Sequence, residues 1–451
     1  MSIRDSRSHF AWGPVAGWVL LTCVAMPARA QTDTPSPAKQ TINQQQEVPQ
    51  IDLPPPDASG SGGGAVNESS ELGVSVGAFT LFPVLDVYAG YDSNVFATVA
   101  PTTASPVTLW RPAVEMRSDW ANHALRFVAG AGFGFYPVAP TQNFQNYNIS
   151  ADGRLDILTD FYLTGLVGFR RATEALGTPN VTFAQAPTVV DSVPVEFGIY
   201  QKFNRFFYQL KGAAVKYWYY DYSTITSLGL PAGSRNRTEY VEALTLGYEV
   251  LEGINLFISP GLNQRIYADQ VNSANQQRDS TGYNMNFGGS MTVGKRTSLD
   301  ASIGYTSQAY LSDGSTTTAG TFSLGGTWNG YEPLILRPSI GRSINESALT
   351  NYQNYISTVV GLDWIYDVHY PWKAVGGLSY STADYTPVPG TGTPPRTDYF
   401  VKASIGALYE VRPQYSIGPV YEYTQGWSTD VATGGPQFNR SLFSIRLVLR
   451  R

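Results

Sequence analysis

Along most of the chain, hydrophobic and polar residues alternate with a period of two. Residues 123–136 show the pattern clearly, because apolar side chains occupy every second position from Leu125 to Phe135 while Arg126 and small residues occupy most of the others. A period of two over this length predicts a β-strand and not a helix. Strands of soluble proteins usually have about 5 to 6 residues, whereas strands that cross a membrane need roughly 9 to 11. The pattern therefore predicts membrane-crossing strands.

From about residue 79 onward, such segments repeat and are separated by breaks of two kinds. Short breaks lie near 119–122, 159–160, 204–205, 251–253, 294–297, 330–333, 366–370 and 412–414. Longer and more polar breaks span 92–106, 137–145, 173–190, 222–235, 269–279, 312–318, 346–352, 386–397 and 428–438. These breaks delimit about 18 strands, or sixteen to eighteen if one hairpin is misplaced. An even number of long strands predicts an all-β fold, a transmembrane antiparallel up-and-down β-barrel with short periplasmic turns and longer extracellular loops.

Charged residues fall on one face of these strands and apolar residues on the other. A cation in the middle of the lipid-facing surface costs about 2 to 4 kcal/mol, so we expect the charged face to line the lumen. The candidate lumen-facing selectivity residues are Glu115, Arg117, Arg126, Arg154, Arg170, Glu196 and Arg265. Either they pair with one another and brace the wall, or some of them line the narrowest point and select solutes by charge. Loop 173–190, the longest expected, could fold inward as a constriction.

Composition favours the membrane barrel over a soluble sandwich. Charged residues make up 14% of the chain, below the roughly 25% of soluble domains, whose outward faces need more charge. Clustered aromatic residues at strand ends, such as 217–220, are typical of membrane-interface girdles, with a sugar-stacking platform as the alternative. Several expected strands contain proline, for which local bulges are one explanation. Examples are Pro112, Pro260, Pro338 and Pro419.

The N-terminal region predicts export and a flexible connection. Residues 1–30 have a basic start, a short apolar stretch and the sequence Ala28-Arg29-Ala30, which is typical of a signal peptide cleaved before Gln31. The only cysteine, Cys23, lies in this segment, and lipid attachment there is an alternative that the preceding Thr22 disfavours. Residues 31–76 are rich in Pro, Gln, Ser and Gly and predict a disordered periplasmic linker. The barrel is expected over 77–451.

No constellation for catalysis, metal binding or cofactor binding stands out. His123 and His369 fall at expected periplasmic turns, and no metal-ligand or phosphate-binding motif is present, so we expect no enzyme, no cofactor and no metal site. The stretch Asp92-Ser93-Asn94 resembles a fragment of a calcium loop, but these residue types are also ordinary turn formers. The expected barrel carries nearly equal numbers of basic and acidic residues, which disfavours nucleic acid as a partner and predicts weak ion selectivity.

Residues 77–98, GAFTLFPVLDVYAGYDSNVFAT, resemble the first strand of a family of outer-membrane β-barrel porins from Gram-negative bacteria. The resemblance rests on a strand that ends in a Gly-Tyr-Asp-x-Asn turn, preceded by a signal peptide and a polar linker. It implies porin or export activity without catalytic residues, and some similar barrels are associated with exopolysaccharide secretion. One departure is the C-terminus, which ends in Arg450-Arg451 where many such barrels end in an aromatic residue.

We therefore expect an outer-membrane channel for passive diffusion of small polar solutes. Export of an exopolysaccharide is the first alternative, and a barrel with a plugged lumen that adheres or scaffolds through its surface loops is the second. The expected partners are outer-membrane lipid and lipopolysaccharide, the barrel-assembly machinery that inserts such proteins, and small polar solutes or polysaccharide. The oligomeric state, the solute and the pore diameter stay open.

Overall fold

The computed structural model describes residues 73–181, 187–220, 232–269, 278–294, 296–311, 314–431 and 434–451. The expected signal peptide, 1–30, and all but the end of the expected linker, 31–76, lie outside these residues. The short strand β1 (Val74–Val76) precedes eighteen long strands. These are β2 (Phe79–Asp92), β3 (Ser105–Ser118), β4 (Ala124–Phe135), β5 (Phe144–Leu158), β6 (Phe161–Thr173), β7 (Val189–Phe203), β8 (Phe206–Tyr220), β9 (Arg237–Leu251), β10 (Ile254–Tyr267), β11 (Ser280–Val293), β12 (Thr297–Tyr310), β13 (Thr316–Tyr331), β14 (Leu334–Glu346), β15 (Tyr352–His369), β16 (Trp372–Pro387), β17 (Arg396–Arg412), β18 (Tyr415–Ser428) and β19 (Phe438–Arg450). Two short 3-10 helices, η1 (Pro140–Gln142) and η2 (Ala232–Arg235), lie in loops.

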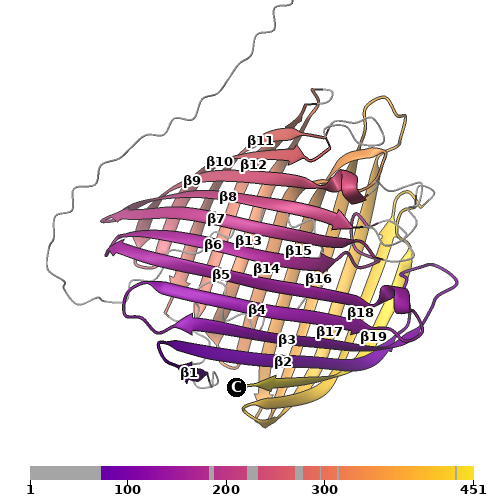
Figure 1. Ribbon diagram of the computed structural model, residues 1–451, viewed down its shortest axis with the longest axis horizontal. Helices are drawn as coiled ribbons and strands as arrows, with labels where there is room; N and C mark the ends of the chain where they lie inside the picture. The colour runs from indigo at the N-terminus through magenta and orange to yellow at the C-terminus, as the bar shows by residue number, and fades with distance from the viewer. Residues whose placement is uncertain are drawn as a thin grey trace, which may run out of the picture. The chain divides into compact units, whose positions relative to one another are not determined.

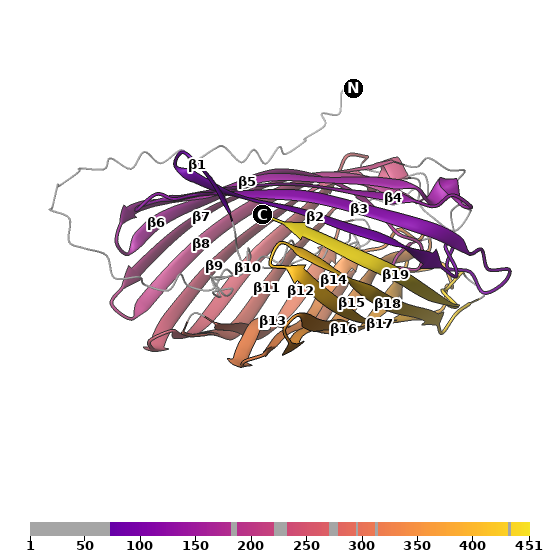
Figure 2. The same ribbon diagram turned by 90° about the horizontal axis from the view of Figure 1, so that it is seen from below.

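The eighteen long strands form one closed antiparallel barrel. Each strand pairs with the next along the chain, and β19 pairs with β2, so that Leu442 lies opposite Asp92 and Arg450 opposite Val84. In Figure 1 the indigo and magenta strands β2–β9 cross in front of the orange and yellow strands β13–β19, and Figure 2 shows the same wall from below. β1 extends the N-terminal end of β2 as a small hairpin around Gly77. The predicted fold class and the strand number are confirmed.

The turns and loops alternate as the sequence predicts. Eight turns of two to five residues lie at one end of the barrel, the short-turn end, and nine loops of five to sixteen residues lie at the other, the long-loop end. By the general rule for such barrels the short-turn end faces the periplasm. Two details differ: β15 continues to His369, so its turn lies at 370–371, and loop 221–236 exceeds loop 174–188 by one residue.

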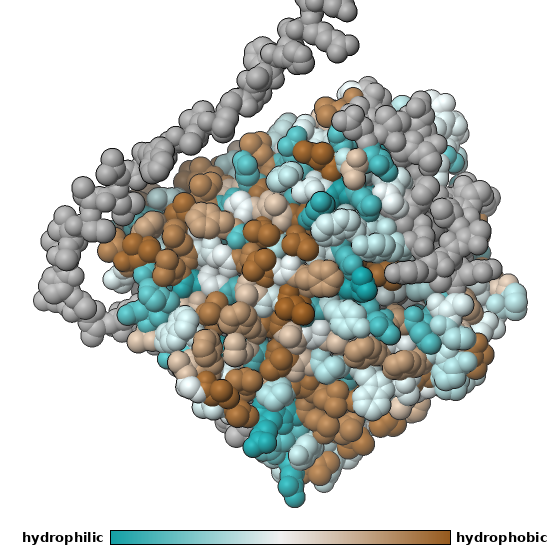
Figure 3. All heavy atoms as spheres, in the orientation of Figure 1, coloured by the Kyte–Doolittle hydropathy of each residue, from teal (hydrophilic) through white to brown (hydrophobic). Residues whose placement is uncertain are grey.

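The outer face of the wall is apolar, as the alternation predicts. Ile303 on β12 is 69% exposed, and Leu262 on β10 and Leu378 on β16 are each 59% exposed, while their strand neighbours at the opposite parity face the lumen. Figure 3 shows brown hydrophobic side chains gathered over the visible wall. Among the described residues, no helix has both the length and the apolar character needed to cross a bilayer.

The strand prolines interrupt pairing on one side without a bulge. At Pro112, Pro260, Pro338 and Pro419 the ladder to one neighbour skips two residues and resumes in the same register, while pairing to the other neighbour continues. Proline has no N–H to donate, so it is tolerated where one neighbour can do without that bond. The expectation of bulges is therefore wrong at these four positions.

The aromatic cluster 217–220 divides between the two faces of β8. Tyr217 and Tyr219 are 8% and 3% exposed and pack inside the barrel against Ala172 and Val190, whereas Tyr220 is 39% exposed on the outer face. A girdle position fits only the outward residues of the cluster. Since the two inward rings are buried, they do not present a platform on which a sugar could stack.

Candidate functional site

The loop between β6 and β7 crosses the lumen. β15 lies nine strands from β6 in either direction around the ring, so it stands on the opposite wall. From this loop the backbone N–H of Asn180 donates to the hydroxyl of Tyr385 on β16 at 2.8 Å, and its side chain donates to the carbonyl of Glu346 on β14 at 3.1 Å. Leu176 is buried with Phe400 on β17 and with other apolar side chains. Residues 174–181 of the loop therefore fold into the lumen, which is the position that the sequence analysis considered for loop 173–190.

The other end of this loop is anchored near its own wall. Both oxygens of the Glu174 carboxylate accept bonds from the guanidinium of Arg235 in η2, at 2.6 and 2.9 Å, and both side chains are almost fully buried. Asn180 has φ of +67°, a left-handed conformation that asparagine tolerates better than most residues. An ion pair at one end and hydrogen bonds to the opposite wall at the other hold the segment across the lumen.

The tip of hairpin β14–β15 also enters the lumen. β14 pairs with β15 as far as Glu346 and Asn354, but its last pair with β13 toward the long-loop end is Ser323 with Gly341. Beyond that point the hairpin lies against the inner face of β10–β13, where the side chain of Asn354 donates to Thr317 at 2.9 Å. The backbone N–H of Ala348 donates to the Asn180 side chain at 2.7 Å, which joins the two inward segments.

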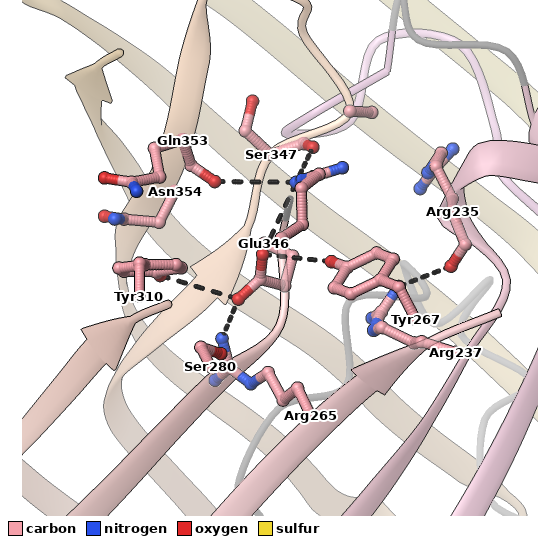
Figure 4. A network of polar contacts seen from close by, with 12 residues as sticks. Arg235, Arg237, Arg265, Tyr267, Ser280, Tyr310, Glu346, Ser347, Gln353 and Asn354 are labelled. Carbon is pink, nitrogen blue, oxygen red and sulfur yellow. Dashed lines mark hydrogen bonds and ion pairs between the residues drawn. The ribbon is translucent and has the colours of Figure 1, made fainter. Parts of the chain in front are cut away.

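A buried network of charged and aromatic side chains holds the hairpin tip in this position (Figure 4). The carboxylate of Glu346 is 3% exposed and pairs with Arg265, whose side chain is 1% exposed. Tyr267 donates its hydroxyl hydrogen to the same carboxylate at 3.0 Å, and Arg278 approaches it at 3.4 Å. Arg265 also donates to the carbonyl of Ile344 at 2.9 Å. Tyr310 donates to the Glu346 carboxylate at 3.5 Å, so two basic groups and two phenols surround one buried acid.

The stretch Asp92-Ser93-Asn94 forms the turn at the end of β2. Asp92 accepts a bond from the backbone N–H of Asn94 at 3.0 Å and pairs with Arg440 on β19. The Asn94 side chain donates to the carbonyls of Thr98 and Asn439 at 2.8 and 2.9 Å. Burial raises the pKa of the nearby Tyr136 phenol, which accepts a bond from Arg440 and stays neutral. These contacts attach the first loop to β19, across the seam that closes the barrel.

Four of the seven candidate selectivity residues form ion pairs on β3–β5. Glu115 pairs with Arg117 at 2.7 Å and contacts Arg126 at 3.9 Å, and Arg126 pairs with Asp152 at 2.8 Å. Arg154 pairs with Asp156 at 2.6 Å and its guanidinium lies 4.0 Å from the centre of the Tyr162 ring. These contacts match the wall-bracing interpretation.

The other three candidates lie apart from this cluster. Arg265 belongs to the Glu346 network. Arg170 and Glu196 are half-buried on β6 and β7, and within the described part of the chain no ion pair is found for either. Of the seven, only Glu115 and Arg117 line the lumen cavity between β14–β19, β2 and β3. The selectivity role of these residues stays a prediction.

A cavity of about 1170 Å³ lies in the lumen against β14–β19, β2 and β3. Residues 175–179 and Pro187 of the β6–β7 loop line part of it, so the crossing loop forms one of its walls. Several arginines that line the cavity are not among the seven residues proposed from the sequence. They are Arg111, Arg337, Arg342, Arg440 and Arg446. Strand parity could have identified some of them, since Arg337 alternates with Leu336 and Pro338, and Arg446 alternates with Ile445 and Leu447.

The comparisons with known proteins agree with this architecture. A family model described as "Putative beta-barrel porin 2" matches residues 70–451. No curated protein matches the sequence. Among solved structures, the outer membrane protein OpdK of Pseudomonas aeruginosa has 12% identity over 82% of this chain and 99% of its own, with a TM-score of 0.43. OccAB3 of Acinetobacter baumannii has 9% identity over 83% of this chain and 100% of its own, with a TM-score of 0.38. The siderophore receptor PirA of P. aeruginosa has 8% identity over 82% of this chain and 80% of its own, with a TM-score of 0.40. Such distant structural similarity carries no argument about function.

Proposed function

We propose, from the premise that the chain belongs to the putative β-barrel porin 2 family, that it is an outer-membrane channel for passive diffusion of small polar solutes. The observation that carries the proposal is the large lumen cavity, which is lined by both charged and apolar side chains inside a closed barrel. A barrel of this size can hold an aqueous path. The residues that line the cavity are the ones a solute in that path would meet.

The crossing loop supports small solutes over polymers. Loop 174–181 and the tip of hairpin β14–β15 occupy the long-loop end of the lumen and are hydrogen-bonded to each other. A polysaccharide chain needs an unobstructed path along the whole axis, so this arrangement disfavours the export alternative. It favours, as the second candidate function, a plugged barrel that works through its surface loops.

We infer further that residues 1–30 direct export to the periplasm and that the barrel-assembly machinery inserts the mature chain. The support is the sequence of the segment, which has a basic start, an apolar stretch and a small-residue cleavage site. N-terminal sequencing of protein purified from outer membranes tests this inference. We expect the mature protein to begin at Gln31.

Swelling of liposomes tests the channel. Purified protein is refolded into liposomes, folding is checked by heat-modifiable gel mobility, and swelling is followed in glycerol, ribose, glucose and raffinose. We expect entry to slow as the solute grows and to be lowest for raffinose. A folded barrel that admits none of these solutes contradicts the channel and supports the plugged barrel. Equal rates for all of them contradict the constriction and favour a conduit for larger sugars.

A further inference from the structure

The charge on the cavity wall differs from the charge of the barrel as a whole. Ten arginine and lysine side chains line the cavity, against five aspartate and glutamate side chains. Two further acids neutralise lining residues, since Asp86 pairs with Arg446 at 2.9 Å and Asp92 pairs with Arg440. Counting both, the basic groups still exceed the acidic groups by three.

Four arginines in the lining, including the terminal Arg451, form no ion pair with a carboxylate side chain of the described residues, whereas most other basic groups there do. Lys373 pairs with Glu410 at 3.1 Å and Lys402 pairs with Glu422 at 3.2 Å. For Arg111, Arg337 and Arg342 no acidic side chain of the described chain lies within ion-pair distance. The Nε atoms of Arg337 and Arg342 are buried and find no hydrogen-bond acceptor in the described residues.

Arg111 belongs to a small electropositive group in the wall formed by β2, β3 and β19. Its guanidinium lies 5.0 Å from the centre of the Tyr88 ring, and the guanidinium of Arg446 lies 5.4 Å from the same ring. A single acid, Asp86, serves this pair of cations and bonds to Arg446 with both oxygens, at 3.0 and 2.9 Å. Arg111 lies opposite Asp86 on β2 but forms no ion pair of its own, since both carboxylate oxygens are bonded to Arg446.

We propose that this cavity attracts and transiently binds small anionic solutes that carry a carboxylate or phosphate group, through Arg111, Arg337 and Arg342. Guanidinium groups bind such oxyanions through two parallel hydrogen bonds and stay charged at any physiological pH. This inference rests on the proposed channel function. It replaces the weak selectivity expected from the nearly neutral barrel, because the unpaired charges are concentrated in the lumen.

The size of the effect follows from Coulomb's law. For an ion about 8 Å from one unpaired guanidinium, in water at physiological salt, the ratio of anion to cation occupancy changes by about twofold. Three such groups acting together change the ratio of anion to cation occupancy by about eightfold at most. The change is smaller where the groups lie farther than about 8 Å from the ion. We expect the permeability ratio of chloride to potassium to be about three or more.

The reversal potential of the purified full-length barrel in a planar bilayer under a potassium chloride gradient tests the proposal. The variants Arg111→Gln and Arg342→Gln should each lower the chloride-to-potassium ratio by about twofold. Lys216→Gln removes the same charge from the exposed outer face of β8 and should leave the ratio unchanged. Heat-modifiable gel mobility confirms that each variant has folded.

The outcomes separate this inference from the channel itself. Anion preference that falls in both lumen variants and persists in Lys216→Gln supports the inference. A wild-type channel that conducts with a ratio of one or below overturns the inference and leaves the channel standing. The inference is also overturned if the wild-type preference persists unchanged in a folded Arg111→Gln, Arg342→Gln double variant. A folded wild-type barrel without any current overturns both proposals.

Discussion

Replacing Glu346 by glutamine tests whether the buried network holds the hairpin tip of β14–β15 inside the lumen. The amide keeps the shape and can still accept the hydrogen bond from Tyr267, but it no longer neutralises Arg265 and Arg278. Breaking a buried ion pair by removing one partner costs about 3 to 5 kcal/mol, because the remaining charge stays buried without compensation. Since glutamine keeps an acceptor, we expect a loss near the lower limit, roughly 3 kcal/mol.

The matched control is Glu332→Gln at the exposed pair of Glu332 with Arg296, where both side chains are at least half exposed. Exposed pairs are typically worth about 0 to 1 kcal/mol. Urea unfolding in detergent micelles, followed by loss of the heat-modifiable band, should show a clearly lower midpoint for Glu346→Gln and almost none of this shift for the control. Equal midpoint shifts in the two variants would refute the role assigned to the network.

Two further predictions concern the constriction and the lipid-facing surface. Replacing residues 175–181 by two glycines removes the segment that reaches Tyr385 and Glu346. We therefore expect a larger single-channel conductance in planar bilayers. An unchanged conductance would mean that the loop does not limit the flow of ions. Ile303→Arg places a cation on the outer wall, where Ile303 is 69% exposed, and should cost about 2 to 4 kcal/mol in urea unfolding. Thr306→Arg, at the opposite parity of β12, should cost little, and equal losses would contradict the assignment of faces.

The architecture could be predicted from the sequence because it depends on local periodicity. Each strand must present apolar residues to lipid at every second position, and each reversal of the chain needs turn-forming residues. A segment of about 20 residues therefore contains the pattern that predicts one strand and its turn. The ends of strands could be predicted less well, because β15 continues past Tyr366 to His369 even though its pairing with β16 shifts register between Asp367 and His369. The positions of the prolines could be read from the sequence. Which neighbouring strand loses its pairing at each proline depends on how the strands are assembled.

The lumen could be predicted only in part, because its contacts join residues far apart in the chain. Parity places Glu115 and Arg126 inside, yet their bonding to each other and to Asp152 depends on the register between strands. Nothing in the sequence around Asn180 indicates that it bonds to Glu346, which lies 166 residues away. The distinction between compensated cations and those without a carboxylate partner, such as Arg342, likewise emerges only when all the strands are assembled.

Single-channel recording of the purified barrel in a planar bilayer tests the central claim most directly. The protein is refolded, its fold is verified by heat-modifiable mobility, and current is recorded at constant voltage in symmetrical potassium chloride. A passive channel with an internal constriction predicts discrete current steps of uniform size that scale linearly with voltage. A folded barrel that inserts into the bilayer and produces no steps would contradict the account, since the lumen would then be closed to ions.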